Sequence, residues 1–212
     1  MDHYVSEDEQ VEAIKKWWKA NGGAIIVGVV IGLLVIFGWQ YWSSYRINQA
    51  EQAALRYAAL SQGLEDNNAN QVRQEGQILM EEFSDSAYAT LAALQLAKLA
   101  AQERDNTTAI KRLEWALEHA HQEGIKDIVR LRLARVLLAE KRRDGAEELL
   151  DQVTSTSFTA EIENLKGDLY MARNQLAKAR AAYQAALGAS GGNPMLQMKL
   201  ENLPSATQVG QE

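Results

Sequence analysis

The sequence has no cysteine and only three histidines among its 212 residues. Without cysteine there can be no disulfide and no thiolate metal site, although this leaves the cellular compartment open. His119 and His121 form the one close pair of histidines. On a helix they point about 200° apart, so they cannot hold one metal ion. We therefore expect no metal site built on histidine or cysteine.

The sequence also lacks the motifs of the common enzyme classes. It contains no phosphate-binding loop and no nucleophile elbow. The neighbouring carboxylates Glu81–Glu82 and Glu147–Glu148 face apart on a helix and cannot act as an acid–base pair. The net charge of −6 argues against nucleic-acid binding, which needs a concentrated basic surface. We expect a binding protein rather than an enzyme, with no cofactor.

Proline is nearly absent: Pro194 and Pro204 are the only two, both close to the end. Helix can therefore run almost without interruption as far as Gly188. After residue 45, apolar residues recur at steps of three and four with no sustained alternation. This is the period of an α-helix. The pattern predicts an all-α protein.

One region has no charged residue at all, from Ala20 to Tyr45. Its apolar centre, Ala24–Trp39, supplies with its flanks the ~20 residues that a helix needs to cross a bilayer. Tryptophan and tyrosine prefer the membrane interface, and they gather at the two edges, at Trp17, Trp18, Trp39, Tyr41, Trp42 and Tyr45. The apolar run ends in bulky residues rather than a small-residue cleavage site. We expect an uncleaved transmembrane anchor that contacts membrane lipid.

The basic residues near the anchor predict its orientation. Lys15, Lys16 and Lys19 precede the span closely, whereas Arg46 and Arg56 follow it. This small excess favours a cytoplasmic N-terminus and an exported C-terminal domain. Within the span, Gly28 and Gly32 have the spacing that lets another membrane helix approach closely. We expect these two glycines to form a membrane helix-packing site.

A repeat of small and large residues follows the anchor. Ala97, Ala109, Leu113 and Ala116 recur after 37 residues, and again after a further 33, as Ala134, Ala146, Leu150, Val153, Gly167, Ala179, Tyr183 and Ala186. A small residue on one helix lets the next lie close against it. A helix–turn–helix unit with a period near 34 residues resembles the tetratricopeptide repeat. The repeats should stack into an α-solenoid, and the apolar helix after Pro194 should cap it.

These patterns predict the fold class and the domain boundaries. We expect an all-α protein with a single N-terminal transmembrane helix, followed by a tetratricopeptide-repeat-like α-solenoid with a C-terminal capping helix. The segments are a short cytoplasmic tail (1–20), the transmembrane anchor (21–45), a membrane-proximal helical pair (46–84), three repeats (85–188), the capping helix (189–204) and a disordered tail (205–212). The helical pair is a candidate for a degenerate extra copy of the repeat.

The expected binding surface is the concave wall formed by the first helix of each pair. By repeat register this wall carries Leu91, Leu94, Lys98, Ile128, Leu131, Arg135, Leu138, Glu161, Asn164, Asp168 and Met171. Alternatively, its leucines and isoleucine are buried by the helices of residues 46–83 or by the last helix. A basic stretch from Lys126 to Arg143 is either a solvated helix face or a site for an acidic partner.

Several short motifs carry a resemblance to one known family. They are Gln10-Val11-Glu12-Ala13, Trp17-Trp18, Asn21-Gly22, Gly38-Trp39-Gln40-Tyr41-Trp42, Ala87-Tyr88-Ala89-Thr90-Leu91-Ala92, Leu131-Arg132-Leu133-Ala134-Arg135 and Met198-Lys199-Leu200-Glu201-Asn202-Leu203. Together they resemble the YfgM family over nearly the whole chain. The segment after Leu203 departs from that pattern as an extension.

The resemblance implies a protein of the Gram-negative inner membrane with its repeat domain in the periplasm. It implies an ancillary subunit of the SecYEG translocon that acts with the membrane-anchored chaperone PpiD. The two would receive unfolded secretory proteins and pass them to periplasmic chaperones. Two other hypotheses stay open: a structural scaffold of an envelope complex, and a cytosol-facing adaptor that sequesters a regulator through the basic stretch.

Overall fold

The computed structural model describes residues 7–204, with the side chains of all of these except residues 7–9 and 13. The chain divides into two compact units, residues 1–51 and residues 52–212, and one helix, α1 (Glu7–Glu65), contributes to both. The helix begins at Glu7, within the segment expected as a tail. The disordered tail expected at 205–212 lies outside the described residues.

The first unit consists of the N-terminal part of α1. By length and composition α1 could cross a membrane, and its most apolar window is only 6% buried. A helix in the core of a soluble protein would instead bury most of its apolar residues. At the far edge of the span, the Trp39 and Trp42 rings pack edge to face with centroids 5.9 Å apart. The Arg46 guanidinium lies 5.1 Å from the Trp42 ring centroid. These side chains suit an aromatic belt at the membrane interface.

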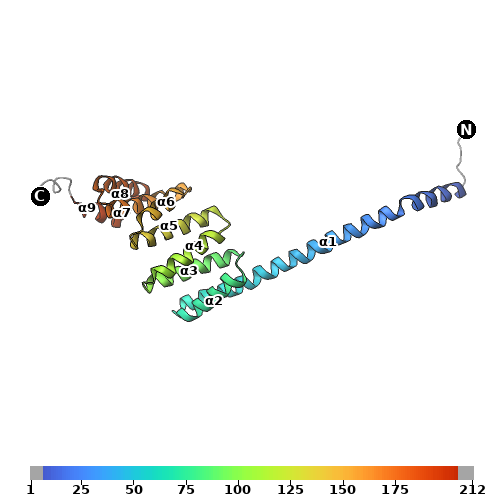
Figure 1. The fold of residues 1–212 in the computed structure, drawn as a ribbon, viewed down its shortest axis with the longest axis horizontal. Coiled ribbons are helices and arrows are strands. Elements are labelled where there is room, and N and C mark those ends of the chain that lie inside the picture. Colours follow the sequence, from blue (N-terminus) through green and yellow to red (C-terminus); the bar gives the residue numbers. More distant parts are fainter. Residues whose placement is uncertain (1–6, 205–212) are drawn as a thin grey trace, which may run out of the picture. The chain divides into compact units, whose positions relative to one another are not determined.

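The second unit is a row of antiparallel helix pairs (Figure 1). The end of α1, from residue 52, pairs with α2 (Ala69–Glu82). The three predicted repeats follow as α3 (Ala87–Gln102) with α4 (Asn106–His119), α5 (Glu123–Ala139) with α6 (Arg143–Asp151), and α7 (Thr159–Ala172) with α8 (Leu176–Ser190). A 3-10 turn (Thr156–Phe158) precedes α7, and α9 (Pro194–Glu201) packs on α8. The predicted fold class is confirmed.

The four pairs share one turn between their two helices. Each turn has a residue in the left-handed region, at Asn67, Arg104, Lys141 and Asn174, with φ between 54° and 63°. The next residue's backbone N–H donates to a carbonyl five residues earlier at 2.8–2.9 Å in every turn. This is the hydrogen bond of a Schellman helix end. The membrane-proximal pair therefore closes in the same way as the three repeats.

Lysine is a costly residue in this turn, and its replacement should stabilise the protein. The left-handed conformation costs a residue with a Cβ about 1–2 kcal/mol, and glycine avoids that cost. We expect Lys141→Gly to raise the free energy of unfolding by about 0.5–1 kcal/mol, after the entropy that glycine adds to the unfolded chain. Urea unfolding of the full chain in detergent measures this change. Arg142→Gly is the matched control: Arg142 has φ −83°, so this change should only destabilise.

The predicted small residues lie in the core. Ala109, Ala134, Ala146, Ala179 and Ala186 have no exposed surface. At Gly167 an added Cβ would overlap the Tyr183 ring, which shows how closely α7 and α8 approach. The pair formed by the end of α1 and α2 has the residue sizes exchanged. Leu60 and Val72 stand where the other pairs have small residues, and Gly76 stands where they have a large one.

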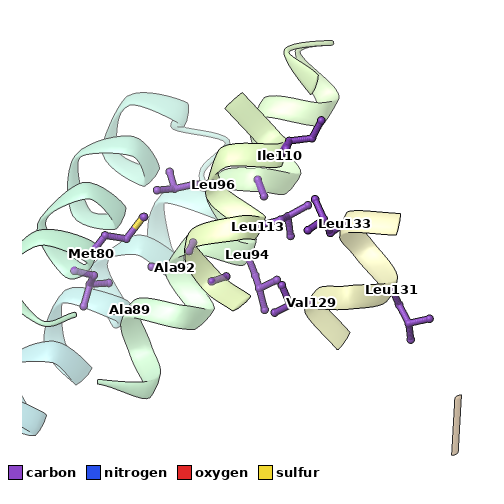
Figure 2. Packing of buried hydrophobic residues seen from close by; sticks show 14 of the residues in the cluster. Met80, Ala89, Ala92, Leu94, Leu96, Ile110, Leu113, Val129, Leu131 and Leu133 are labelled. Atoms are coloured by element: carbon purple, nitrogen blue, oxygen red, sulfur yellow. The ribbon is translucent and has the colours of Figure 1, made fainter. Parts of the chain in front are cut away.

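Two separate hydrophobic clusters form the interior. The larger cluster runs from Ala53 through all the helices up to Leu165 in α7. In Figure 2, Leu94 of α3 points toward Val129 of α5, and Leu113 of α4 lies beside Leu133. The smaller cluster joins α8 to α9 through Ala179, Tyr183, Ala186, Leu196 and Leu203. The C-terminal helix therefore rests on a core of its own.

Candidate functional site

Two leucines predicted for the concave wall belong to the protein interior. Leu94 is 5% exposed and Leu131 is 2% exposed, and both are members of the large cluster. In Figure 2, Leu131 points away from Leu94 and from the contact with α4. Leu94 points toward Val129 of the next repeat (Figure 2). Neither side chain presents a surface to a partner in this conformation.

The accessible part of the wall lies on α3 and α5. Leu91, Ile128 and Leu138 are half-buried, and Lys98 is exposed. Arg135 is also exposed and pairs with Glu161 of α7, with 2.5 Å between Nη2 and Oε1. Lys98 lines a cleft of about 340 Å³ with the end of α1, the start of α2 and the last turns of α3. It is the only charged residue among those lining this cleft.

In the third repeat, helix α9 covers the predicted wall. The Lys199 ammonium donates to Asn164 Oδ1 at 2.7 Å and to Asp168 Oδ1 at 2.6 Å. The Tyr183 hydroxyl donates to the same Asp168 oxygen at 2.6 Å. Met171 packs against the small cluster under α9. Asn164, Asp168 and Met171 are therefore engaged by the chain's own last helix, as the alternative interpretation of the wall allowed.

Sequence reasoning did not identify Lys199 as a member of this site. The predicted cap consisted of apolar residues, and Lys199 lies between Leu196 and Leu200 on the same helix. Tyr183 was recognised only as a large repeat residue. One signal was present in the sequence: Asp168 makes the wall of the third repeat acidic, and Lys199 supplies the opposite charge.

The environment of Tyr183 makes the stability of this site depend on pH. Burial of the ring, followed by the hydrogen bond to the Asp168 carboxylate, raises the pKa of Tyr183 above its ordinary value. An unfolded chain ionises its tyrosines near pH 10. The contribution of the hydroxyl is therefore complete below about pH 10 and is lost as the pH rises further, because only the unfolded chain then releases the proton.

We expect Tyr183→Phe to lower the free energy of unfolding at pH 7 by about 1.5–3 kcal/mol, the range for a hydrogen bond to a charged group. The difference between the variant and the original chain should shrink above about pH 10. Urea unfolding of both chains at pH 7, 9 and 11 measures it. A difference that stays constant across this range would contradict the assignment.

Asp127 holds the start of α5 to the segment before α7. Its side chain is 1% exposed and accepts hydrogen bonds from Arg130 Nη1 at 2.8 Å and from the Ser155 backbone N–H at 3.1 Å. Its two oxygens also accept from the Thr154 backbone N–H and hydroxyl, both at 3.4 Å. A buried carboxylate that already accepts four hydrogen bonds stabilises the fold and is not available to a partner.

The basic stretch is partly neutralised within the protein. Lys126 pairs with Glu123 at 2.8 Å, Arg130 pairs with Asp127, and Arg135 pairs with Glu161. Three further cations are exposed and form no salt bridge within residues 7–204: Arg132, Lys141 and Arg142. This arrangement favours the interpretation of a solvated helix face.

The histidine of α4 takes part in packing. The His119 ring stacks on Trp115 with 3.9 Å between the centroids, and its Nδ1 lies 2.9 Å from the Trp115 carbonyl oxygen. Within the described part of the chain, no three histidine or carboxylate side chains come together as a metal site would require.

A family model described as a tetratricopeptide repeat-like domain matches residues 15–205, which include the apolar span and every helix pair. The chain belongs to this family. A protein of Haemophilus influenzae named "Ancillary SecYEG translocon subunit" is 33% identical over 96% of this chain and 100% of its own length. Proteins with the same name from Aggregatibacter actinomycetemcomitans and Escherichia coli are 30% and 29% identical, over 96% of this chain and 100% and 99% of their own lengths. No solved structure matches this chain.

These comparisons confirm the resemblance that the sequence motifs indicated. The match extends from one end of the relatives to the other, so it covers both the apolar span and the repeats. Likeness in both parts is more informative than a shared repeat fold alone, because one fold hosts many functions.

Proposed function

We propose that this chain is an ancillary subunit of the SecYEG translocon in the bacterial inner membrane. It is a membrane-anchored protein-binding module and not an enzyme. The observation that carries the proposal is the end-to-end match to relatives with that name, across both the anchor and the repeats. The repeat stack supports it, because paired helices of this kind form extended surfaces that bind other proteins.

The proposal includes a location and a working cycle. The repeat domain lies in the periplasm, as the basic residues before the span favour. With the chaperone PpiD it receives unfolded secretory proteins as they leave the channel and hands them to periplasmic chaperones. The anchor confines the domain to the membrane plane beside the channel. This raises its effective concentration near emerging chains without requiring high intrinsic affinity.

In this proposal the anchor and the repeat domain contact different partners. The anchor packs against the translocon or its partner through Gly28 and Gly32, where an added Cβ has nothing within 4 Å. The accessible wall, defined as Leu91, Lys98, Ile128 and Leu138, contacts protein clients. Half-buried apolar side chains next to an exposed cation suit weak and exchangeable contacts with unfolded segments.

Co-purification with SecYEG from mildly solubilised membranes tests the association. We expect SecYEG to be recovered with the full chain, and recovery to fall at least fivefold for the Gly28→Leu/Gly32→Leu variant. Gly38→Leu is the matched control, because Gly38 lies in the same span on another face of the helix. Failure to recover SecYEG with the original chain would overturn the proposed function. Equal recovery with both variants would overturn only the role of the glycine pair.

Single cysteines test the orientation, since the chain has none of its own. Arg132→Cys places a thiol at an exposed position of α5. We expect a membrane-impermeant maleimide to label it in cells whose outer membrane alone has been permeabilised. Labelling only after the inner membrane is broken would place the repeats in the cytosol. That result would favour the adaptor hypothesis instead.

A further inference from the structure

Helix α9 occupies the place where the first helix of another repeat would pack. It follows α8 and packs on it, as α5 packs on α4 and α7 on α6. We call the surface beneath it the cap seat. Its apolar part consists of Tyr170, Met171, Leu176, Ala179, Tyr183, Ala186 and Leu187. Its polar part consists of the two side-chain oxygens of Asn164 and Asp168 that receive the Lys199 ammonium.

Several features make α9 replaceable. The cluster beneath it is separate from the large core. The helix has only 8 residues, too few to be stable without its seat. Gly191 and Gly192, both with positive φ, form the connection to α8 and give the unfolded segment wide conformational freedom. Its outer methionines, Met195 and Met198, are 65% and 61% exposed, so no part of residues 7–204 packs over this side of the helix.

The cap seat is complementary to a defined pattern of side chains. Leu196 and Leu203 are buried in it, and Leu200 packs at its edge. Between them Lys199 reaches both oxygen acceptors, and its ammonium also lies 5.2 Å from the Tyr183 ring centroid. The seat therefore accepts two apolar side chains of the helix, a third from Leu203 just beyond its end, and one cation beside them. An acidic residue at the Lys199 position would face the Asp168 carboxylate.

We propose that α9 is an exchangeable internal ligand, and that a helix of a partner protein replaces it on the cap seat. That helix is amphipathic and carries a lysine or arginine at the Lys199 position, with apolar residues three before, one after and four after it. The charge of Asp168 and the apolar contacts of Leu196, Leu200 and Leu203 specify this chemistry. The proposal goes beyond association with a translocon, because it assigns a recognition pattern to a surface that the chain itself now fills.

The exchange follows from mass action. The tethered α9 competes with any partner for the cap seat. The apparent affinity of the original chain for a partner helix is therefore reduced in proportion to the fraction of molecules whose seat is open. A change that weakens α9 without altering the seat should therefore increase the affinity for a partner helix. Lys199→Glu is such a change, because it removes two hydrogen bonds and places a second carboxylate next to Asp168.

The test uses the full chain in detergent and a fluorescent peptide that spans residues 193–204. We expect the Lys199→Glu chain to bind this peptide at least tenfold more tightly than the original chain, by fluorescence anisotropy. The same peptide with glutamate in place of its lysine, and a scrambled peptide of the same composition, should not show this gain. Circular dichroism confirms that the helices of both chains are retained.

A charge exchange provides the matched control. In the Asp168→Lys/Lys199→Glu chain the ion pair is restored with reversed sign, so α9 should close again. The glutamate peptide, whose charge suits this altered seat, should then bind no more tightly than the original peptide binds the original chain. The proposal is overturned if the Lys199→Glu chain binds no more tightly than the original chain, or if the glutamate peptide gains equally. Recovery of SecYEG with the same variants is a separate readout, so failure of this proposal leaves the proposed function standing.

Discussion

Replacing Gly167 by leucine is expected to disrupt the last repeat and the cap together. An added Cβ at this position already overlaps the Tyr183 ring, so a larger side chain forces α7 and α8 apart. The tyrosine then loses its buried site and its hydrogen bond to Asp168. We expect a loss of about 3 kcal/mol or more in the free energy of unfolding, at the upper end of overpacking effects. Urea unfolding and limited proteolysis of the full chain measure this loss.

Gly188→Ala is the matched control for this prediction. Gly188 lies in α8, and an added Cβ there has nothing within 4 Å. Alanine should stabilise the helix by up to about 1 kcal/mol, because glycine is the weaker helix former. A double-mutant cycle adds a second check: in a Tyr183→Ala background, Gly167→Ala should no longer be penalised. A loss at Gly167 that persists without the ring would show that the close approach of α7 and α8 is not the cause.

Replacing Asp127 by alanine is expected to cost about 3–5 kcal/mol, the range for breaking a buried ion pair from one side. The change leaves the Arg130 side chain, which is 14% exposed, without its closest partner. It also leaves the Ser155 and Thr154 backbone N–H groups without their acceptor. The connection between α6 and α7 should loosen as a result. Urea unfolding gives the energy, and hydrogen exchange at residues 152–158 locates the change.

Glu123→Ala is the control for Asp127, because Glu123 pairs with the same Arg130, and with Lys126, at the surface. It lies 2.8 Å from Lys126 and 3.4 Å from Arg130, and its side chain is 61% exposed. Exposed pairs contribute about 0–1 kcal/mol, so its loss should be small. Asp127→Asn should fall between the two, because the amide oxygen still accepts while the charge is gone. If Asp127→Ala costs no more than Glu123→Ala, Asp127 does not tie these segments together.

The sequence predicted the repeats because their packing depends on residue size. Ala97, Ala134 and Gly167 stand at one position of the pattern, and each lies where two helices approach closely. The membrane-proximal pair was harder to recognise, because Leu60 and Val72 stand where the repeats have small residues. Gly76, in turn, leaves room for the Leu96 side chain of the next helix. Such a compensation acts between different repeats. It becomes visible only when the helices are placed in space.

The candidate wall was predicted less fully than the fold. The spacing that placed Leu94 and Leu131 on the first helices was right, but register alone does not decide how far a neighbouring repeat covers each side chain. The contact of Lys199 with Asp168 joins residues 31 apart through a bend at two glycines. Asp127 lies within the basic stretch, and its contacts with Thr154 and Ser155 join residues 27 and 28 apart. Long-range polar contacts of this kind leave no periodic signal in a sequence.

Photocrosslinking in growing cells can show whether the accessible wall works beside the translocon. A photoreactive residue is placed at Leu91 or Ile128 on the wall, and at Lys111 on the exposed side of α4 as the control. We expect adducts to SecYEG, to PpiD or to newly exported chains from the wall positions, and few from Lys111. Adducts only to a cytosolic protein, or equal yields from the three positions, would rule out this role for the wall.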